Sequence, residues 1–369
     1  MRHDGSEDDR ASCSSSSSTR SRSRSRSRSP TSLFEDSLFT LFSHNQPAHG
    51  DPGDVCKYTH DNLPPRKIAS TSGSGARKAT LRYRIAQNSG TNTKLFAHHQ
   101  WDAGLYLADL IAEQSFVPTQ SQAASEVALG KQRDAFADVR GKAVVELGAG
   151  TGLPGLVACV MGAAKTVITD YPDPHVIENL RGNLELALVP KQQASDSSSQ
   201  KQRNPHYAEA RARVEVLGLG WGNHDEEARV YNSSLSSGGS GGGYDVVLAA
   251  DVLWVSSAHP LLIHSIRALL KRDRNARCVL IAGFHTGRPA VRRFFVQLAQ
   301  ADTTGDATLA DGRCAGIVPD WEEASYGGIW ERNIDGATRA YSDTEDDMGD
   351  ISDRGSWVVV ASLRWADLA

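Results

Sequence analysis

Three glycines and a carboxylate form the most informative pattern in this chain. An apolar segment beginning at Val144 runs into Gly148, Gly150 and Gly152, and after a helix-length stretch a second apolar segment ends on Asp170. Glycines at the end of a strand let the backbone turn tightly and approach a ligand, because no Cβ blocks it. A carboxylate about 20 residues later can accept hydrogen bonds from both hydroxyls of a ribose. The pattern predicts a nucleoside-containing cofactor at the carboxyl ends of parallel strands.

The residues around these glycines indicate which nucleoside to expect. The glycines follow G-x-G-x-G spacing, whereas the dinucleotide pattern G-x-G-x-x-G places its last glycine one residue later. Pro154 removes an N–H donor near the start of the helix, where a pyrophosphate would bind. Glu146 would repel a diphosphate but suits a positively charged ligand. S-adenosylmethionine has that charge and an adenosine, so a dinucleotide oxidoreductase and a ligand-free structural turn are the weaker interpretations.

Composition restricts the compartment and the partners. The chain has 369 residues, 39% of them hydrophobic, and a formal net charge of −4. No basic face stands out in its C-terminal two thirds, so nucleic-acid binding through that region is not indicated. The cysteines are odd in number and contain no C-x-x-C pair, which favours a reducing compartment and argues against a disulfide framework or a structural zinc site. We expect a cytoplasmic location, since no apolar run could span a membrane and no signal peptide is visible. We also expect a monomer with no resident metal.

The N-terminal residues have a different composition. Residues 1–30 contain a serine run and an arginine–serine repeat, so they lack the apolar surface needed to fold, and we expect disorder. This arm is either a solvated tail or a phosphorylatable segment that contacts RNA or nuclear partners. Residues 33–42 have apolar positions at roughly helical spacing, and 43–79 resemble a linker. We therefore predict an arm and linker over 1–79 and one domain over 80–369.

Alternating apolar elements predict the fold of that domain. Continuous apolar segments suit strands covered on both faces, and strands alternating with helices imply a parallel sheet with right-handed crossovers. The expected fold is an α/β three-layer Rossmann-like sandwich, with surface loops at 190–206 and 232–243. The expected strands are 80–85, 143–147, 166–170, 214–217, 244–250, 277–284 and 356–365, and the expected helices are 101–113, 153–161, 174–188, 258–271 and 289–300.

Residues from about 80 to 368 resemble the class I, seven-β-strand methyltransferases that depend on S-adenosylmethionine. More narrowly, they resemble fungal proteins labelled nicotinamide N-methyltransferases, relatives of the lysine methyltransferases that act on elongation factors and chaperones. The resemblance implies a mostly parallel seven-stranded sheet whose last strand is antiparallel. It rests on His99–Gly104, Glu146–Gly152, Thr169–Pro172, Trp221–Gly222, Leu248–Trp254, Ala282–Gly287 and Ile329–Arg332. The arginine–serine arm has no counterpart in this pattern.

The resemblance also implies a set of cofactor contacts. Gly148, Ala149 and Gly150 would line the methionine and ribose portion, and Asp170 would bind the ribose hydroxyls. Trp221 would lie against the adenine, where stacking on an aromatic ring contributes ~1–3 kcal/mol by analogy with base–aromatic contacts. Trp101 would close the methionine end, and Ala250 would contact the cofactor after the fourth strand. Trp221 alone is also compatible with an ordinary core tryptophan, although the flanking Gly220 and Gly222 permit a close ligand approach, and Trp101 is also compatible with an anchor for the helix that it opens.

Asp251 and Trp254 mark the expected substrate entrance. Lysine-modifying relatives usually have Asp-x-x-Tyr or Asp-x-x-Phe here, so Trp254 is a departure that leaves the substrate open. Asp251 would orient an amine, unless it merely caps the following helix. His285 is near the same rim, but a loop histidine without a partner visible in the sequence is more often structural, and we leave it out of the predicted site.

Several acceptors remain open from the sequence. The first is a protein amine, a lysine or an N-terminus, with a translation elongation factor as one candidate. The second is a small pyridine such as nicotinamide, because fold and cofactor do not determine the acceptor. A hypothesis from another class is an RNA- or nucleus-associated binding protein that acts through its arm. A nucleic-acid methyltransferase is weaker, because Ala-Asp-Val-Leu-Trp replaces the usual Asn/Asp-Pro-Pro-aromatic motif.

Overall fold

A computed structural model describes residues 48–66, 79–87, 99–118, 135–189, 205–235, 242–300, 316–320, 328–342, 344 and 355–368. Residues 44–369 form one compact unit. The predictions for the arginine–serine arm and for the amphipathic segment at 33–42 lie outside the described residues.

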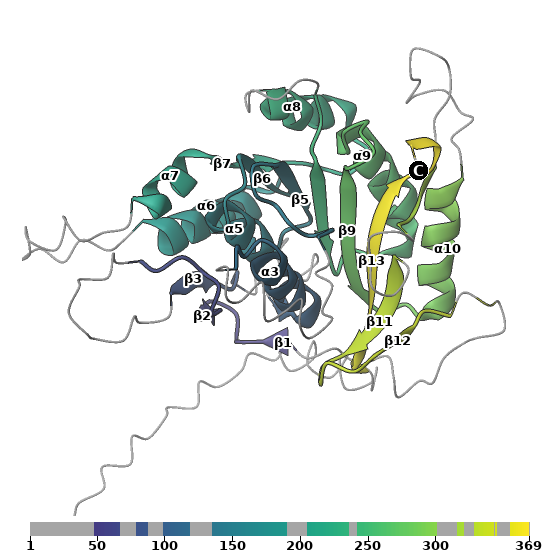
Figure 1. The fold of residues 1–369 in the computed structure, drawn as a ribbon, viewed down its shortest axis with the longest axis horizontal. Helices are drawn as coiled ribbons and strands as arrows, with labels where there is room; N and C mark the ends of the chain where they lie inside the picture. The colour runs from purple at the N-terminus through teal and green to yellow at the C-terminus, as the bar shows by residue number, and fades with distance from the viewer. Residues whose placement is uncertain are drawn as a thin grey trace, which may run out of the picture. The chain divides into compact units, whose positions relative to one another are not determined.

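One large mixed sheet organises this unit (Figure 1). Its strand order is β12-β11-β13-β9-β8-β5-β6-β7, and β10 pairs with β13. Neighbouring strands from β9 to β7 are parallel, while β13 is antiparallel to both β9 and β11. This arrangement confirms the predicted α/β fold with an antiparallel last strand. Six of the seven expected strands lie in this sheet, whereas the one expected at 80–85 forms β3, which pairs with β2 in a separate sheet, and β10, β11 and β12 were not among the expected strands. The strands are β5 Ala143–Leu147, β6 Lys165–Asp170, β7 Val214–Gly218, β8 Val246–Ala250, β9 Arg277–Gly283, β10 Ile317–Pro319, β11 Ile329–Asn333, β12 Thr338–Ala340 and β13 Trp357–Trp365.

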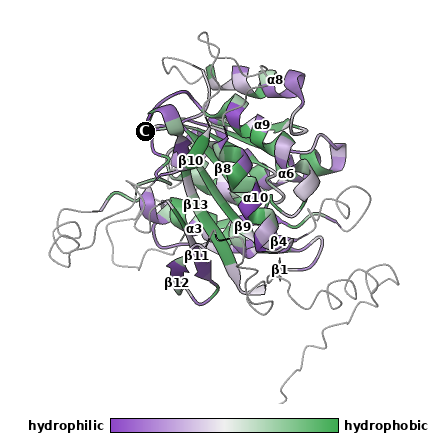
Figure 2. Cartoon of the chain, turned by 90° about the vertical axis from the view of Figure 1, so that its right-hand side faces the viewer, coloured by the Kyte–Doolittle hydropathy of each residue, from purple (hydrophilic) through white to green (hydrophobic). Residues whose placement is uncertain are grey.

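Helices cover both faces of the sheet, because its central strands are apolar along their length (Figure 2). Val144 and Ile168 point into the core shared with α3, α5, α6 and α7, whereas Val145 and Val167 point into the core shared with α8, α9 and α10. The helices are α3 Asp102–Gln114, α5 Leu153–Val160, α6 Pro174–Leu188, α7 His206–Ala212, α8 His224–Leu235, α9 His259–Leu269 and α10 Arg288–Ala299. No helix in the described part of the chain has the length and hydropathy needed to cross a bilayer.

The structure corrects three predictions about connecting segments. The linker assigned to 43–79 contains β2 (Val55–Thr59), which pairs with β3 (Thr80–Arg84). Tyr58 explains why: its ring is buried and its hydroxyl donates to Asp109 Oδ1 on α3 at 2.8 Å, so a tertiary contact outweighs the local composition. Helix α7 begins at the end of the first predicted loop. Helix α8 was not predicted and occupies the start of the second.

A second short pairing brings the chain ahead of the domain close to the predicted site. Strand β1 (Ala48–His49) pairs with β4 (Gln100–Trp101), which directly precedes α3. Trp101 thus has a backbone neighbour from a segment that the sequence assigned to the linker.

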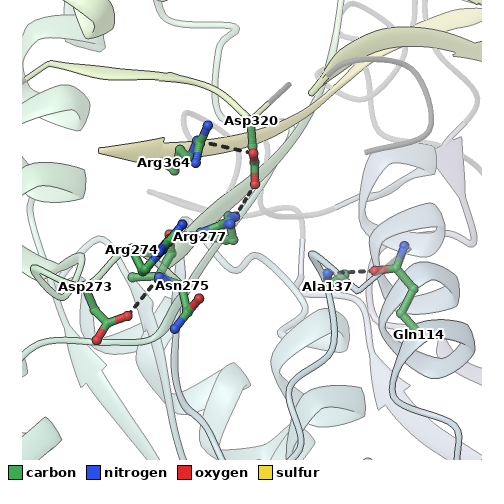
Figure 3. Close-up of polar contacts among 9 residues, drawn as sticks. Gln114, Ala137, Asp273, Arg274, Asn275, Arg277, Asp320 and Arg364 are labelled. Atoms are coloured by element: carbon green, nitrogen blue, oxygen red, sulfur yellow. Dashed lines mark hydrogen bonds and ion pairs between the residues drawn. The ribbon is translucent and has the colours of Figure 1, made fainter. Parts of the chain in front are cut away.

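A buried cluster of charges fastens the antiparallel side of the sheet. Asp320, just after β10, is 0% exposed, and Figure 3 shows Arg277 from β9 and Arg364 from β13 directed toward it. The Arg364 Nε–Asp320 Oδ1 distance is 3.3 Å, and Arg277 Nε donates to Oδ2 of the same carboxylate. Removing one partner would leave a buried charge uncompensated, so this cluster holds β9, β10 and β13 in register.

Candidate active site

The glycine turn follows β5 and has the conformation that its sequence predicts. Gly148, Gly150 and Gly152 have φ values of 63°, 56° and 75°. A Cβ on Gly148 would lie 2.9 Å from Val252 Cγ1 and 3.1 Å from Trp221 Cζ2, so only glycine fits there. A Cβ on Gly150 would meet nothing within 4 Å. The turn is therefore tightly packed at Gly148 and open at Gly150. A ligand can approach the backbone at Gly150, because no Cβ blocks it.

Glu146 is buried directly beneath this turn. Its side chain accepts a hydrogen bond at 3.0 Å from the Gly155 N–H, in the first turn of α5, and the residue is 1% exposed. The pKa of Glu146 is raised to about 8, chiefly by burial; the Gly155 N–H opposes the rise, and the negative charge of Asp170 adds to it. Pro154 lacks an N–H and that of Gly155 is occupied, so this helix start is poorly suited to a pyrophosphate. A positive ligand would instead stabilise the ionised form of Glu146.

Asp170 ends β6 with its carboxylate held in place. The Gly150 N–H and the Tyr171 N–H each donate to one of its oxygens at 2.7 Å. Burial raises the pKa of Asp170, and these two backbone donors oppose the rise. The carboxylate thus has a fixed orientation and retains acceptor capacity for the hydroxyls of a sugar.

Trp221 stands beyond β7 in a turn whose backbone is fixed by acidic side chains. The Gly220 N–H donates to Glu226 Oε2 at 2.6 Å, and the Gly222 N–H donates to Glu227 Oε1 at 3.1 Å. The indole packs on the core beneath α8 and α9 and also lines the cavity beside the glycine turn. Both interpretations of Trp221, core residue and ligand wall, are therefore consistent with its position.

Trp101 and Asp251 lie at the other end of the cavity, together with a residue that the sequence prediction left out. The His285 ring contacts that of Trp101, with centroids 5.6 Å apart, and its Nε2 lies 3.0 Å from Asp251 Oδ2. The Gly283 N–H donates to Asp251 Oδ1 at 2.9 Å. Asp251 has a φ of 55°, unusual for a residue with a side chain, and its carboxylate serves these partners instead of capping a helix.

Electrostatics favour the charged forms of Asp251 and His285. Burial alone would raise the pKa of Asp251, but the charge of His285 and its hydrogen bond outweigh burial and lower it. Burial would lower the pKa of His285, and Asp251 raises it. His285 therefore has a partner, Asp251, that was not visible in the sequence. Its partner follows a neighbouring strand, and parallel strands β8 and β9 bring the two ends together.

All of the predicted site residues line one cavity of about 310 Å³. The cavity lies at the carboxyl ends of β5, β6, β7 and β8, and its size falls within the range of small-molecule sites. The lining includes Trp101, Glu146, Gly148, Ala149, Gly150, Asp170, Trp221, Ala250, Asp251 and Trp254. It also includes residues that the prediction omitted, among them His99, Gln100, Thr151, Tyr171, Leu219 and Leu261.

The sheet order and this acidic, glycine-lined cavity are those of a class I S-adenosylmethionine-dependent methyltransferase. A family model described as lysine methyltransferase matches residues 81–301, more than half of the chain. The chain belongs to this family, and the expected enzyme class and cofactor are confirmed.

Three curated relatives share the same printed description, protein N-terminal and lysine N-methyltransferase EFM7. That of Emericella nidulans is 33% identical over 145 residues, which are 39% of this chain and 48% of the relative. That of Gibberella zeae is 28% identical over 229 residues, 61% of this chain and 68% of the relative. That of Schizosaccharomyces pombe is 29% identical over 211 residues, 56% of this chain and 64% of the relative. The matched region thus spans about half to two thirds of these relatives.

Proposed function

We propose that this protein transfers a methyl group from S-adenosylmethionine to a protein amine, a lysine side chain or an N-terminus. The printed descriptions of its relatives name both kinds of amine. A translation elongation factor is the substrate to test first, as the sequence resemblance implies. The observation that carries the proposal is that Asp251, Trp101 and Trp254 line the same cavity as the residues suited to the cofactor.

The chain's own residues divide the cavity into two parts. Asp170 and Asp251 follow strands on opposite sides of β5, which puts these strand ends about 10 Å apart at the usual strand spacing. On the β6–β7 side, Asp170 would accept the ribose hydroxyls and Trp221 would cover the adenine. Gly148 and Gly150 offer backbone that a ligand can approach, and Glu146 would face positive charge. When bound, the cofactor supplies an activated methyl group on a sulfonium.

The β8 side suits an amine on an aliphatic stem. Asp251 would attract and orient the nitrogen, and Trp101 and Trp254 would pack against the methylenes and the positive head. The amine must lose its proton before it attacks, and alignment then provides most of the rate acceleration, so Asp251 acts by orientation. His285 does not line the cavity but fixes Asp251, so we assign it as a positioning residue.

The test is methyl transfer by the full chain, with labelled S-adenosylmethionine and three acceptors offered separately: a purified elongation factor, cell extract and nicotinamide. Label in a discrete protein band, lost in Asp251→Asn and retained in the control Asp138→Asn, is the expected result. Asp138 has a partly exposed carboxylate paired with Arg140 outside the cavity, so it controls for loss of a paired aspartate. Label only in a pyridine product would contradict the protein substrate. Removal of residues 1–30 separates the other class of function: an arm-driven protein would lose its localisation or binding, whereas an enzyme would keep its turnover.

A further inference from the structure

A cluster of metal-binding side chain types lies outside the cavity. His224 and Glu227 are one turn apart at the start of α8, and His264 lies on α9, which packs beside α8 (Figure 1). One candidate ligand atom from each of the three residues can be chosen so that all lie within 4.8 Å of one another. The two imidazole rings meet edge to face, with centroids 4.8 Å apart.

Glu227 is buried, and hydrogen bonds hold its carboxylate in a fixed orientation. The residue is 4% exposed, and its Oε1 accepts hydrogen bonds from Ser265 Oγ at 2.6 Å and from the Gly222 N–H at 3.1 Å. The His264 Nδ1 atom lies 3.0 Å from both carboxylate oxygens, Oε1 and Oε2, so these contacts together fix the carboxylate against the His264 ring. Within the described part of the chain, the ion-pair partner of Glu227 is His264. No lysine or arginine in that part pairs with the negative charge of this buried carboxylate. Hydrogen-bonded support of this kind is typical of carboxylates that bind metals.

The distances agree with coordination after a small movement. Two ligand atoms about 2.1 Å from one ion, at angles between 90° and tetrahedral, lie about 3.0–3.4 Å apart, as His264 and Glu227 already do. The remaining ligand, His224, is the first residue of α8 and is exposed. A change of its side-chain rotamer can therefore bring its imidazole to the ion and complete the set of three ligands.

We propose that His224, Glu227 and His264 bind one divalent transition-metal ion of the zinc type. Two imidazoles and a carboxylate are a donor set that zinc accepts with one position left open, whereas magnesium and calcium prefer oxygen ligands. The sequence predicted no metal, because the cysteine pattern that it relied on does not report on a His–Glu site. The ion would be linked through Glu227 and Gly222 to Trp221 in the cavity.

The experiment uses the full chain without an affinity tag, stripped with a chelator and titrated with Zn²⁺ by calorimetry. His224→Ala and His264→Ala are compared with His175→Ala, an exposed histidine near the start of α6 and therefore a matched control. Glu227 is left intact because its loss would disturb the fold. Circular dichroism and affinity for S-adenosylhomocysteine verify that each variant is folded.

We expect one zinc site per chain. His224→Ala and His264→Ala should each weaken its affinity for zinc at least about tenfold, and His175→Ala should leave that affinity unchanged. Millimolar Mg²⁺ should not compete with zinc for the site. At 100 times the native Kd, zinc should raise the Tm of the native chain by about 5 °C, and the same zinc concentration should raise that of His264→Ala by no more than about half as much. Co²⁺ should give visible absorption bands that disappear in His264→Ala. The proposal is overturned if the native chain binds no zinc, if either ligand variant binds as the native chain does, or if Mg²⁺ competes.

Discussion

Asp251→Asn tests the substrate half of the cavity, because asparagine keeps the shape and the acceptor for the Gly283 N–H but removes the charge. Two opposite charges 4 Å apart attract by about 4 kcal/mol at an effective dielectric constant of 20, and desolvation offsets part of that. We therefore expect a loss of about 2–3 kcal/mol in binding and orienting the amine, which is about 30- to 150-fold in kcat/KM for the protein substrate. Affinity for S-adenosylhomocysteine should change less than about threefold, since Asp170 and Trp221 lie on the other side of β5.

The same variant has a distinct dependence on pH. The lowered pKa of Asp251 adds stability above its unfolded value of about 3.9, which is lost as pH falls through the folded pKa. The raised pKa of His285 adds stability below its unfolded value of about 6.5, which is lost as pH rises through the folded pKa. The destabilisation by Asp251→Asn in urea should therefore be largest between about pH 4 and 6.5 and decrease above. A destabilisation independent of pH would refute the Asp251–His285 pairing, and a kcat/KM equal to that of the native chain would refute the role of Asp251 in orienting the amine.

Three further changes probe the rest of the structure. Trp221→Ala should weaken binding of S-adenosylhomocysteine by about 5- to 150-fold in calorimetry, from the ~1–3 kcal/mol of lost stacking, whereas Trp221→Phe should retain most of the affinity; equal losses would argue against stacking. Because burial raises the pKa of Glu146 to about 8, affinity for the cationic cofactor should increase from pH 7 to 9 as Glu146 ionises, and Glu146→Gln should remove that increase; an unchanged pH profile would contradict it. Asp320→Ala should lower the free energy of unfolding by about 3–5 kcal/mol in urea because it removes the buried carboxylate that pairs with Arg277 and Arg364, and a loss below 1 kcal/mol would show that the cluster is not needed.

Local patterns predicted the cofactor half of the site well. The glycine turn and the end of β6 lie within one strand–helix–strand unit, so their spacing alone brings Gly150 and Asp170 into contact. The sequence placed His285 near the rim that holds Asp251, but nothing local indicates that these two side chains, 34 residues apart, contact each other. Strand adjacency in the folded sheet creates that contact.

The missed elements depend on tertiary packing in the same way. Helix α8 is largely polar, and Val230 is one of few residues that it buries, so it lacks the apolar stripe that predicts a helix. Strand β2 alternates weakly, and the docking of Tyr58 on α3 stabilises it. The departures from prediction at β1 and β2 are therefore contacts that the local sequence does not encode.

Calorimetric titration of the purified chain with S-adenosylhomocysteine tests the central claim most directly. One molecule should bind per chain, and Asp170→Ala should weaken this binding at least tenfold while Asp138→Ala leaves it unchanged. A native chain that gives no binding signal, or an Asp170→Ala chain that binds as tightly as the native one, would contradict the assignment of this cavity to the cofactor.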